Sequence, residues 1–286
     1  MKRGRSSLGK TEIEGRDATK VQDKRPKTLC ISPTPSSGGD AGPGSADGAG
    51  AFALTPIANG GRTSPESFGS AWRKTAEAVM RGVREMPVPT SGKHRYAMVC
   101  SSNINRSVMG QIVLEAAGLA CCSYGVGTSV KLPGKDRHSP KVFRFGTPYL
   151  SMHDNLAAED KRLFGKSGVL SLLQRDAQVK RHPERWQDVP TEEAAEFDVV
   201  LCFEHRIFDA VVDDMQNRDP ENFKPVHLIA MSVKDSPVEA EKASKDVIKL
   251  CQQLEELDDL EEGAGDVVAS FESQSKLPLL HQICHL

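Results

Sequence analysis

From residue 93 onward, short apolar runs alternate with longer segments of mixed polarity. The apolar runs occupy residues 94–100, 121–126, 197–203 and 226–233. Apolar positions recur with helical spacing in residues 106–118, in residues 148–180 with a break at Gly168, and in residues 204–215 and 238–260. The final segment LPLLHQICHL fits an additional edge strand. This alternation predicts an α/β fold, a three-layer sandwich whose mainly parallel central sheet is covered by helices on both faces.

In such a fold the ligand site lies beyond the carboxyl ends of the parallel strands. The first apolar run ends at Cys100, and the run at 226–233 is followed by Lys234. We therefore expect the functional site just after Cys100 and close to Lys234.

The first third of the chain has a different composition. Residues 1–92 hold 14 of the 24 glycines and 8 of the 17 prolines, and they carry a net charge of +5 against −7 for the rest. Residues 1–69 contain too few apolar side chains to offset their ordering entropy, which predicts a disordered low-complexity tail. Residues 70–92 predict an amphipathic helix and a proline-containing linker, and residues 93–286 one globular domain.

Several classes of protein are excluded by the same composition. No run approaches 18 consecutive apolar residues, and the opening MKRGRSSLGK lacks the apolar stretch of a secretory signal. The seven cysteines are irregularly spaced and suggest neither a disulfide framework nor a zinc site, so we expect an intracellular protein without a metal or cofactor. The adjacent Cys121 and Cys122 are expected to be strand residues.

A run of small and polar residues follows the first predicted strand and reads CSSNINRS from Cys100 to Ser107. Backbone N–H groups converge where a turn enters a helix, and the helix dipole adds positive potential, so this run predicts a phosphate-binding loop. The same field and Arg106 should favour the thiolate form of Cys100, which would make it a nucleophile. Arg106 can hold phosphate oxygens, and Ser107 can donate a hydrogen bond to the sulfur. Between Cys100 and Arg106 the loop consists of Ser101, Ser102, Asn103, Ile104 and Asn105.

Further segments extend this pattern into a resemblance. GVGTSVKLPG, PERWQD, FDVVLCFEHRIFD and VHLIAMSVKD follow the loop in that order. Together they resemble the RNA polymerase II C-terminal-domain phosphatases of the Ssu72 type, over about residues 95–286. The resemblance implies a fold like that of the low-molecular-weight tyrosine phosphatases. It also implies removal of phosphate from the serine at position five of the heptad repeat, preceding a cis proline, in transcription and mRNA 3′-end processing.

The resemblance also implies roles for individual residues. Cys100 would be the nucleophile, Arg106 the phosphate ligand, Ser107 the support of the thiolate, and Asp235 the general acid. The residues matching a loop along the peptide groove are Lys131, Leu132 and Pro133. The implied partners are the phosphorylated polymerase tail, a 3′-end processing scaffold and a prolyl isomerase, in the nucleus and without direct binding to nucleic acid or membrane.

The chain departs from the family pattern in places. Ser232 stands where the family has an acidic residue paired with the general acid, residues 108–110 differ from the usual ones after the loop, and the N-terminal extension is unexpected. Asp235 could instead cap the helix predicted from Val238, and Lys131 could be a solvated lysine. Asp219, in an Asp-Pro pair, is a second candidate acid, although it precedes a strand and should lie at the far end of the sheet.

Two other functions stay open at this level. One is a low-molecular-weight tyrosine phosphatase on the same fold. The other is a scaffold subunit of the cleavage and polyadenylation machinery, in which catalysis is secondary.

Overall fold

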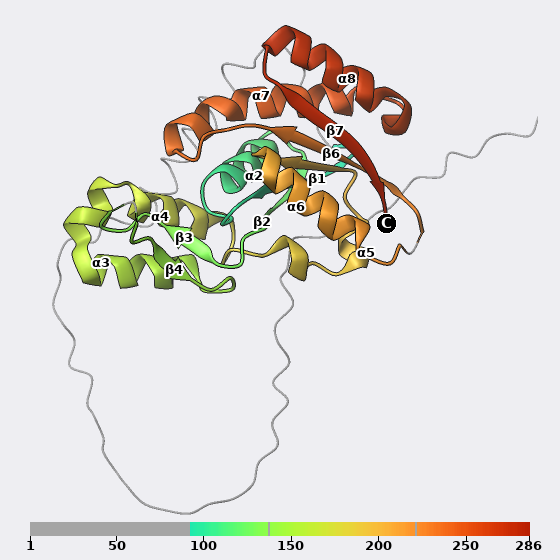
Figure 1. Cartoon of the computed structure of the whole chain (residues 1–286). Coiled ribbons are helices and arrows are strands. Elements are labelled where there is room, and N and C mark those ends of the chain that lie inside the picture. The colour runs from blue at the N-terminus through green and yellow to red at the C-terminus, as the bar shows by residue number, and fades with distance from the viewer. Residues whose placement is uncertain (1–91, 137, 221) are drawn as a thin grey trace, which may run out of the picture. The chain divides into compact units, whose positions relative to one another are not determined.

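The computed structural model describes residues 92–136, 138–220 and 222–286 (Figure 1). The predicted tail at 1–69 and the predicted helix and linker at 70–92 lie outside the described residues, apart from Gly92. In the described ranges, no helix combines the length and the apolar character needed to cross a membrane.

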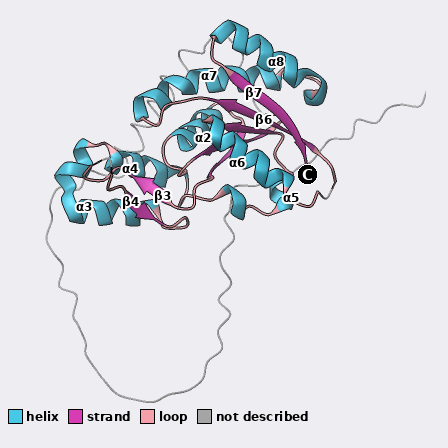
Figure 2. Cartoon of the chain, in the orientation of Figure 1, coloured by secondary structure: helices cyan, strands magenta, loops and turns pink. Residues whose placement is uncertain are grey.

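A five-stranded sheet in the order β2-β1-β5-β6-β7 forms the centre of the domain (Figure 2). Its strands are β1 Arg95–Cys100, β2 Ala120–Gly125, β5 Val199–Cys202, β6 Pro225–Met231 and β7 Leu279–His285. The first four are parallel, and β7 runs antiparallel to β6 at the edge. The predicted α/β fold, the mainly parallel sheet and the C-terminal edge strand are therefore confirmed.

Helices cover both faces of this sheet (Figure 1). On one face α2 packs against α7, and α7 packs against α8; on the other, α6 lies over β5, β6 and β7. The helices that make these layers are α2 Arg106–Ala116, α6 His205–Gln216, α7 Pro237–Glu255 and α8 Leu260–Ser275, with the short α5 Thr191–Ala194 and the 3-10 helix η1 Trp186–Asp188 before β5. The helix predicted over 238–260 is confirmed as α7, but it ends at Glu255. The helix α8 was not predicted; Asp259 caps it by accepting a hydrogen bond from the backbone N–H of Glu262 (3.2 Å).

A smaller lobe stands beside the loop that follows β1. It contains a hairpin of β3 Val130–Leu132 and β4 Lys141–Phe143, with α3 Tyr149–Lys166 and α4 Val169–Val179. Gly168 separates the two helices with a left-handed φ of +78°, so the predicted break is confirmed. The lobe has its own apolar core, and Ile104 of the loop belongs to it. The loop thus sits between the two cores.

The PERWQD segment packs rather than binds. Trp186 is fully buried, with ring centroids 5.7 Å from Tyr124 and 6.2 Å from Phe197. Arg185 donates through Nε to the carbonyl oxygen of Gly127 (3.0 Å). This segment therefore ties β2 and the following turn to the rest of the domain.

Candidate active site

The loop from Cys100 to Arg106 connects the interior strand β1 to α2, so it lies at the carboxyl end of the sheet as predicted. Within the described part of the chain, none of the backbone N–H groups from Ser101 to Arg106 donates a hydrogen bond. Buried backbone donors are nearly always paired. A loop that keeps several of them free at a helix N-terminus is suited to hold an anion.

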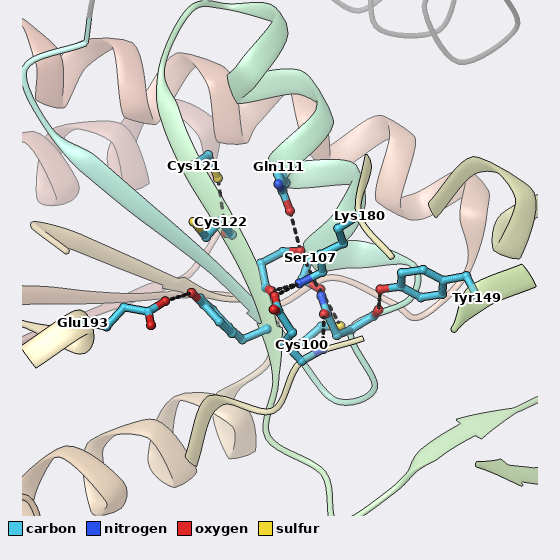
Figure 3. A network of polar contacts seen from close by, with 12 residues as sticks. Cys100, Ser107, Gln111, Cys121, Cys122, Tyr149, Lys180 and Glu193 are labelled. Carbon is cyan, nitrogen blue, oxygen red and sulfur yellow. Dashed lines mark hydrogen bonds and ion pairs between the residues drawn. The ribbon is translucent and has the colours of Figure 1, made fainter. Parts of the chain in front are cut away.

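Cys100 and Ser107 meet beneath this loop. Cys100 Sγ lies 3.0 Å from Ser107 Oγ, and the cysteine is only 3% exposed (Figure 3). Asn103 Nδ2 donates to the same hydroxyl oxygen at 3.1 Å. Because Asn103 fills an acceptor position of the hydroxyl, the hydroxyl hydrogen of Ser107 is free to point at the sulfur. Such a bond stabilises a thiolate.

Asn103 fixes the course of the loop. Its φ of +53° is a left-handed conformation that asparagine tolerates better than most residues. Its carbonyl oxygen accepts from the Tyr149 hydroxyl (2.7 Å), and its Oδ1 accepts from the backbone N–H of Glu184 (2.9 Å). Nδ2 also donates to Ser123 Oγ (2.9 Å). Bonds from separate segments thus hold this buried residue in place.

Arg106 is also buried, at 2% exposed, and its guanidinium is anchored on one side. Nη1 donates to the carbonyl oxygens of Phe203 (3.1 Å) and Val233 (2.8 Å) and to Glu204 Oε2 (3.3 Å). Nη2 lies 3.4 Å from Asp235 Oδ2. Nε has no partner among the described residues. The remaining donor capacity of this fork is suited to phosphate oxygens.

Asp235 reaches the loop from the segment after β6. Its Oδ1 accepts from Asn105 Nδ2 at 3.0 Å, and its side chain is 58% exposed. The alternative that Asp235 caps α7 is wrong, because Ser236 is the N-cap and its Oγ accepts from the backbone N–H of Glu239 (3.3 Å). Asp219 precedes β6, which runs parallel to β1, and therefore lies toward the opposite end of the sheet. The structure brings Asp235, and not Asp219, to Asn105 and Arg106 of the loop.

The segment from Lys131 to Pro133 borders the loop on another side. The backbone N–H of Lys131 donates to Ser102 Oγ (3.2 Å). Lys131 and Pro133 are exposed, whereas Leu132 is 3% exposed and belongs to the core of the smaller lobe. Two of the three predicted groove residues are thus accessible, and the Leu132 side chain anchors the hairpin from below.

Comparison with known proteins decides the family. The family model described as Ssu72-like protein matches residues 94–286. The chain belongs to this family. The match includes every element of the sheet and all residues of the loop.

Two curated relatives of this Ssu72-like chain carry the same name. The RNA polymerase II C-terminal domain phosphatase SSU72 of Danio rerio is 37% identical over 190 residues, which is 66% of this chain and 96% of the relative. The protein of the same name from Homo sapiens is 36% identical with the same coverage. The family is one of protein phosphatases, so the chain is a protein phosphatase by descent.

Solved structures agree with this placement. A crystal structure of the Drosophila melanogaster serine phosphatase of the RNA polymerase II C-terminal domain superposes with a TM-score of 0.65 at 31% identity, covering 68% of this chain and 100% of the other. A second structure holds D. melanogaster Ssu72 with Symplekin and a cis peptidomimetic carrying phosphoserine at heptad position five, with a TM-score of 0.65 at 30% identity and the same coverage.

Sequence reasoning missed two glycines that shape the Ssu72-like site. A Cβ on Gly125 would lie 2.8 Å from the backbone nitrogen of Asn103 and 2.9 Å from the carbonyl oxygen of Ser101. A Cβ on Gly127 would lie 2.8 Å from the same oxygen, which accepts the Gly127 N–H at 2.9 Å. The end of β2 and the turn after it therefore approach the phosphate loop more closely than a side chain would allow. The GVG spacing in the sequence was the available signal.

Sequence reasoning also missed the polar side chains that form hydrogen bonds to the loop, or to residues beside it, from distant segments. Tyr149 is buried, which raises the pKa of its hydroxyl well above the ordinary value and keeps it a donor to Asn103. Lys180 donates to the Ser123 carbonyl oxygen and to Glu184 Oε2 (2.7 Å) (Figure 3). Burial lowers the pKa of Lys180, and Glu184 opposes that shift. No local motif marked these residues, because their role depends on tertiary contacts.

Proposed function

We propose that this chain is a cysteine-dependent serine phosphatase that acts on the C-terminal domain of RNA polymerase II, at phosphoserine in heptad position five followed by a cis proline. The names of its relatives and the peptide in the D. melanogaster complex point to this substrate. The observation that carries the proposal is the Cys100 sulfur, 3.0 Å from a serine hydroxyl beneath a loop of unpaired N–H groups.

In the first step, the Cys100 thiolate attacks phosphorus, so that an S–P bond forms and the P–O bond to the substrate serine breaks. The loop N–H groups and Arg106 bind the non-bridging oxygens of the phosphate and stabilise their negative charge in the transition state. Asp235, protonated at the start, gives its proton to the leaving serine oxygen. Its bonds to Asn105 and Arg106 keep it beside the loop.

In the second step, water attacks phosphorus, the S–P bond breaks, and inorganic phosphate leaves. The Asp235 carboxylate takes the proton from the attacking water and so returns to its starting form. The hydroxyl of Ser107 stabilises the departing thiolate of Cys100. The two steps together consume one water and regenerate every group.

We further propose that the chain works in the nucleus, in transcription and mRNA 3′-end processing. The D. melanogaster relative was solved with Symplekin, and a scaffold of that kind is the partner we propose here. A prolyl isomerase would supply the cis form of the substrate, because an unfolded Ser-Pro bond is cis in only about 10–30% of molecules and isomerises over tens of seconds.

The test is hydrolysis of heptad-repeat phosphopeptides by the full chain, with one serine phosphorylated at a time. We expect the highest kcat/KM for phosphoserine at position five. A preference for phosphotyrosine would favour the tyrosine phosphatase alternative. Tight binding of the scaffold without hydrolysis of any peptide would favour the scaffold alternative.

A further inference from the structure

Arg175, on α4, reaches under the phosphate loop from the smaller lobe. Its Nη2 donates to the carbonyl oxygens of Ile104 (2.9 Å) and Asn105 (3.3 Å). These carbonyls belong to the two peptide groups that lead from the loop into α2. The Arg175 side chain is only 12% exposed, so solvent takes little part in these contacts.

Asp176 fixes the orientation of the Arg175 guanidinium. Its Oδ1 accepts from both Nε (2.9 Å) and Nη2 (2.7 Å) of Arg175, and its side chain is completely buried. Neighbouring residues of a helix do not normally face each other. A buried ion pair also carries a large desolvation cost, so its presence calls for a role other than net stabilisation.

We looked for that role in the orientation of the two peptide groups that Arg175 contacts. In a trans peptide the C=O and the N–H point in opposite directions. With the carbonyls of Ile104 and Asn105 held toward Arg175, the N–H groups of Asn105 and Arg106 point away from it. Both N–H groups belong to the unpaired set of the loop.

We propose that Arg175, aligned by Asp176, is a positioning residue for phosphate binding, which fixes these two peptide groups with their N–H bonds toward the phosphate oxygens. This inference rests on the proposed function. It predicts that a change behind the loop, without contact to the phosphate, weakens phosphate binding.

The test is titration of the full chain with inorganic phosphate, measured by calorimetry and as competitive inhibition of p-nitrophenyl phosphate hydrolysis. Arg175→Ala should raise the Kd for phosphate about tenfold or more, the usual worth of a hydrogen bond to a charged group. Arg175→Lys keeps the charge without the fork and should fall between wild type and Arg175→Ala. Arg162→Ala, an exposed arginine on α3, is the matched control and should leave the Kd unchanged.

Variants of Asp176 provide a second test of the same inference. Asp176→Ala should weaken phosphate binding, and Asp176→Asn should recover most of that loss, because an amide oxygen accepts the same two bonds. A general loss of folding would not follow this order. If Arg175→Ala does not fold, Arg175→Lys and the two Asp176 variants carry the test.

Two results would overturn the inference. One is a folded Arg175 variant that binds phosphate as wild type does; the other is equal binding by Asp176→Ala and Asp176→Asn. Failure of the proposed function looks different, because the wild-type chain would then neither bind inorganic phosphate nor hydrolyse p-nitrophenyl phosphate.

Discussion

Cys100 lies under a cradle made almost entirely of backbone, so its chemistry and the binding of phosphate are separable. Replacing Cys100 with Ser should abolish turnover of phosphopeptide, because serine is far less nucleophilic at neutral pH. The N–H groups of the loop are unchanged, so inorganic phosphate should still bind. Steady-state hydrolysis and a phosphate titration on the same preparation check both halves. Hydrolysis near the wild-type rate would rule out the covalent mechanism.

Asp235 lies beside Arg106, and a serine leaving group needs a proton that an aryl group does not. Asp235→Asn should slow phosphopeptide hydrolysis by roughly 10²- to 10⁴-fold and p-nitrophenyl phosphate hydrolysis much less. Asp219→Asn is the matched control and should slow neither. Comparing kcat for both variants on both substrates makes the assignment. A selective loss in the Asp219 variant would reverse it.

Asp176 gives the fold a pH dependence with a definite sign. Burial raises the pKa of Asp176 to about 7, while Arg175 and Lys180 oppose the shift, and the unfolded carboxyl titrates near ~4. Between these values the folded chain binds more protons than the unfolded chain, so this group's contribution to stability falls as pH rises toward 7. Asp176→Asn removes that titration.

The free energy of unfolding of Asp176→Asn, minus that of wild type, should therefore be about 2–3 kcal/mol larger at pH 8 than at pH 5. Denaturant unfolding at both pH values measures it. The comparison uses the difference between pH values, because replacing the carboxyl group with an amide also changes the hydrogen bonds to Arg175. If the difference in unfolding free energy between Asp176→Asn and wild type is the same at both pH values, Asp176 keeps an ordinary pKa in the fold.

The residues of the site that sequence could identify are those adjacent in the chain or fixed by strand order. Cys100, Arg106 and Ser107 share one strand-to-helix turn, and Asp235 follows the strand whose carboxyl end points the same way. Arg175 and Tyr149 contact the loop across 71 and 46 residues of sequence. Nothing in their local spacing indicates this, because only the packing of the smaller lobe brings them there.

At the level of elements, the end of β2 packs against the phosphate loop without room for a methyl group at Gly125. Gly125→Ala should cost roughly 1–3 kcal/mol of stability, as overpacking usually does, and should lower kcat/KM because Asn103 and Ser101 must move. Gly165→Ala is the control: no atom lies within 4 Å of a Cβ there, and alanine favours the helix by up to about 1 kcal/mol. Thermal unfolding and phosphopeptide hydrolysis measure both. Equal behaviour of the two variants would contradict the close approach.

The elements predicted from apolar spacing were the long or fully buried ones. The strands of the sheet were predicted because Val99, Val200 and their neighbours are buried on both faces and give continuous apolar runs. The hairpin of β3 and β4 escaped notice because each strand has only three residues. The end of α7 escaped notice because the polar turn before Leu260 interrupts helical spacing for too few residues.

At the scale of the whole molecule, the composition of residues 1–69 predicts few buried contacts. Deleting them should leave the melting temperature and the turnover of p-nitrophenyl phosphate nearly unchanged. Differential scanning calorimetry of the full and shortened chains, with activity measured in parallel, makes the comparison. A large fall in melting temperature would refute this interpretation of the tail.

The interior position of β1, between β2 and β5, has a consequence for biosynthesis. β1 pairs with β2, which follows it closely, but its other partner is β5, and Arg95 and Asp198 are 103 residues apart. At roughly 5–20 residues per second, a ribosome needs roughly 5 to 20 s to add that partner. Throughout that interval one edge of the apolar strand β1, next to the nucleophile, has backbone N–H and C=O groups without a neighbouring strand to pair with. The nascent chain is therefore most exposed to aggregation and to chaperone binding before β5 emerges, and slow, non-local folding is expected of the finished domain.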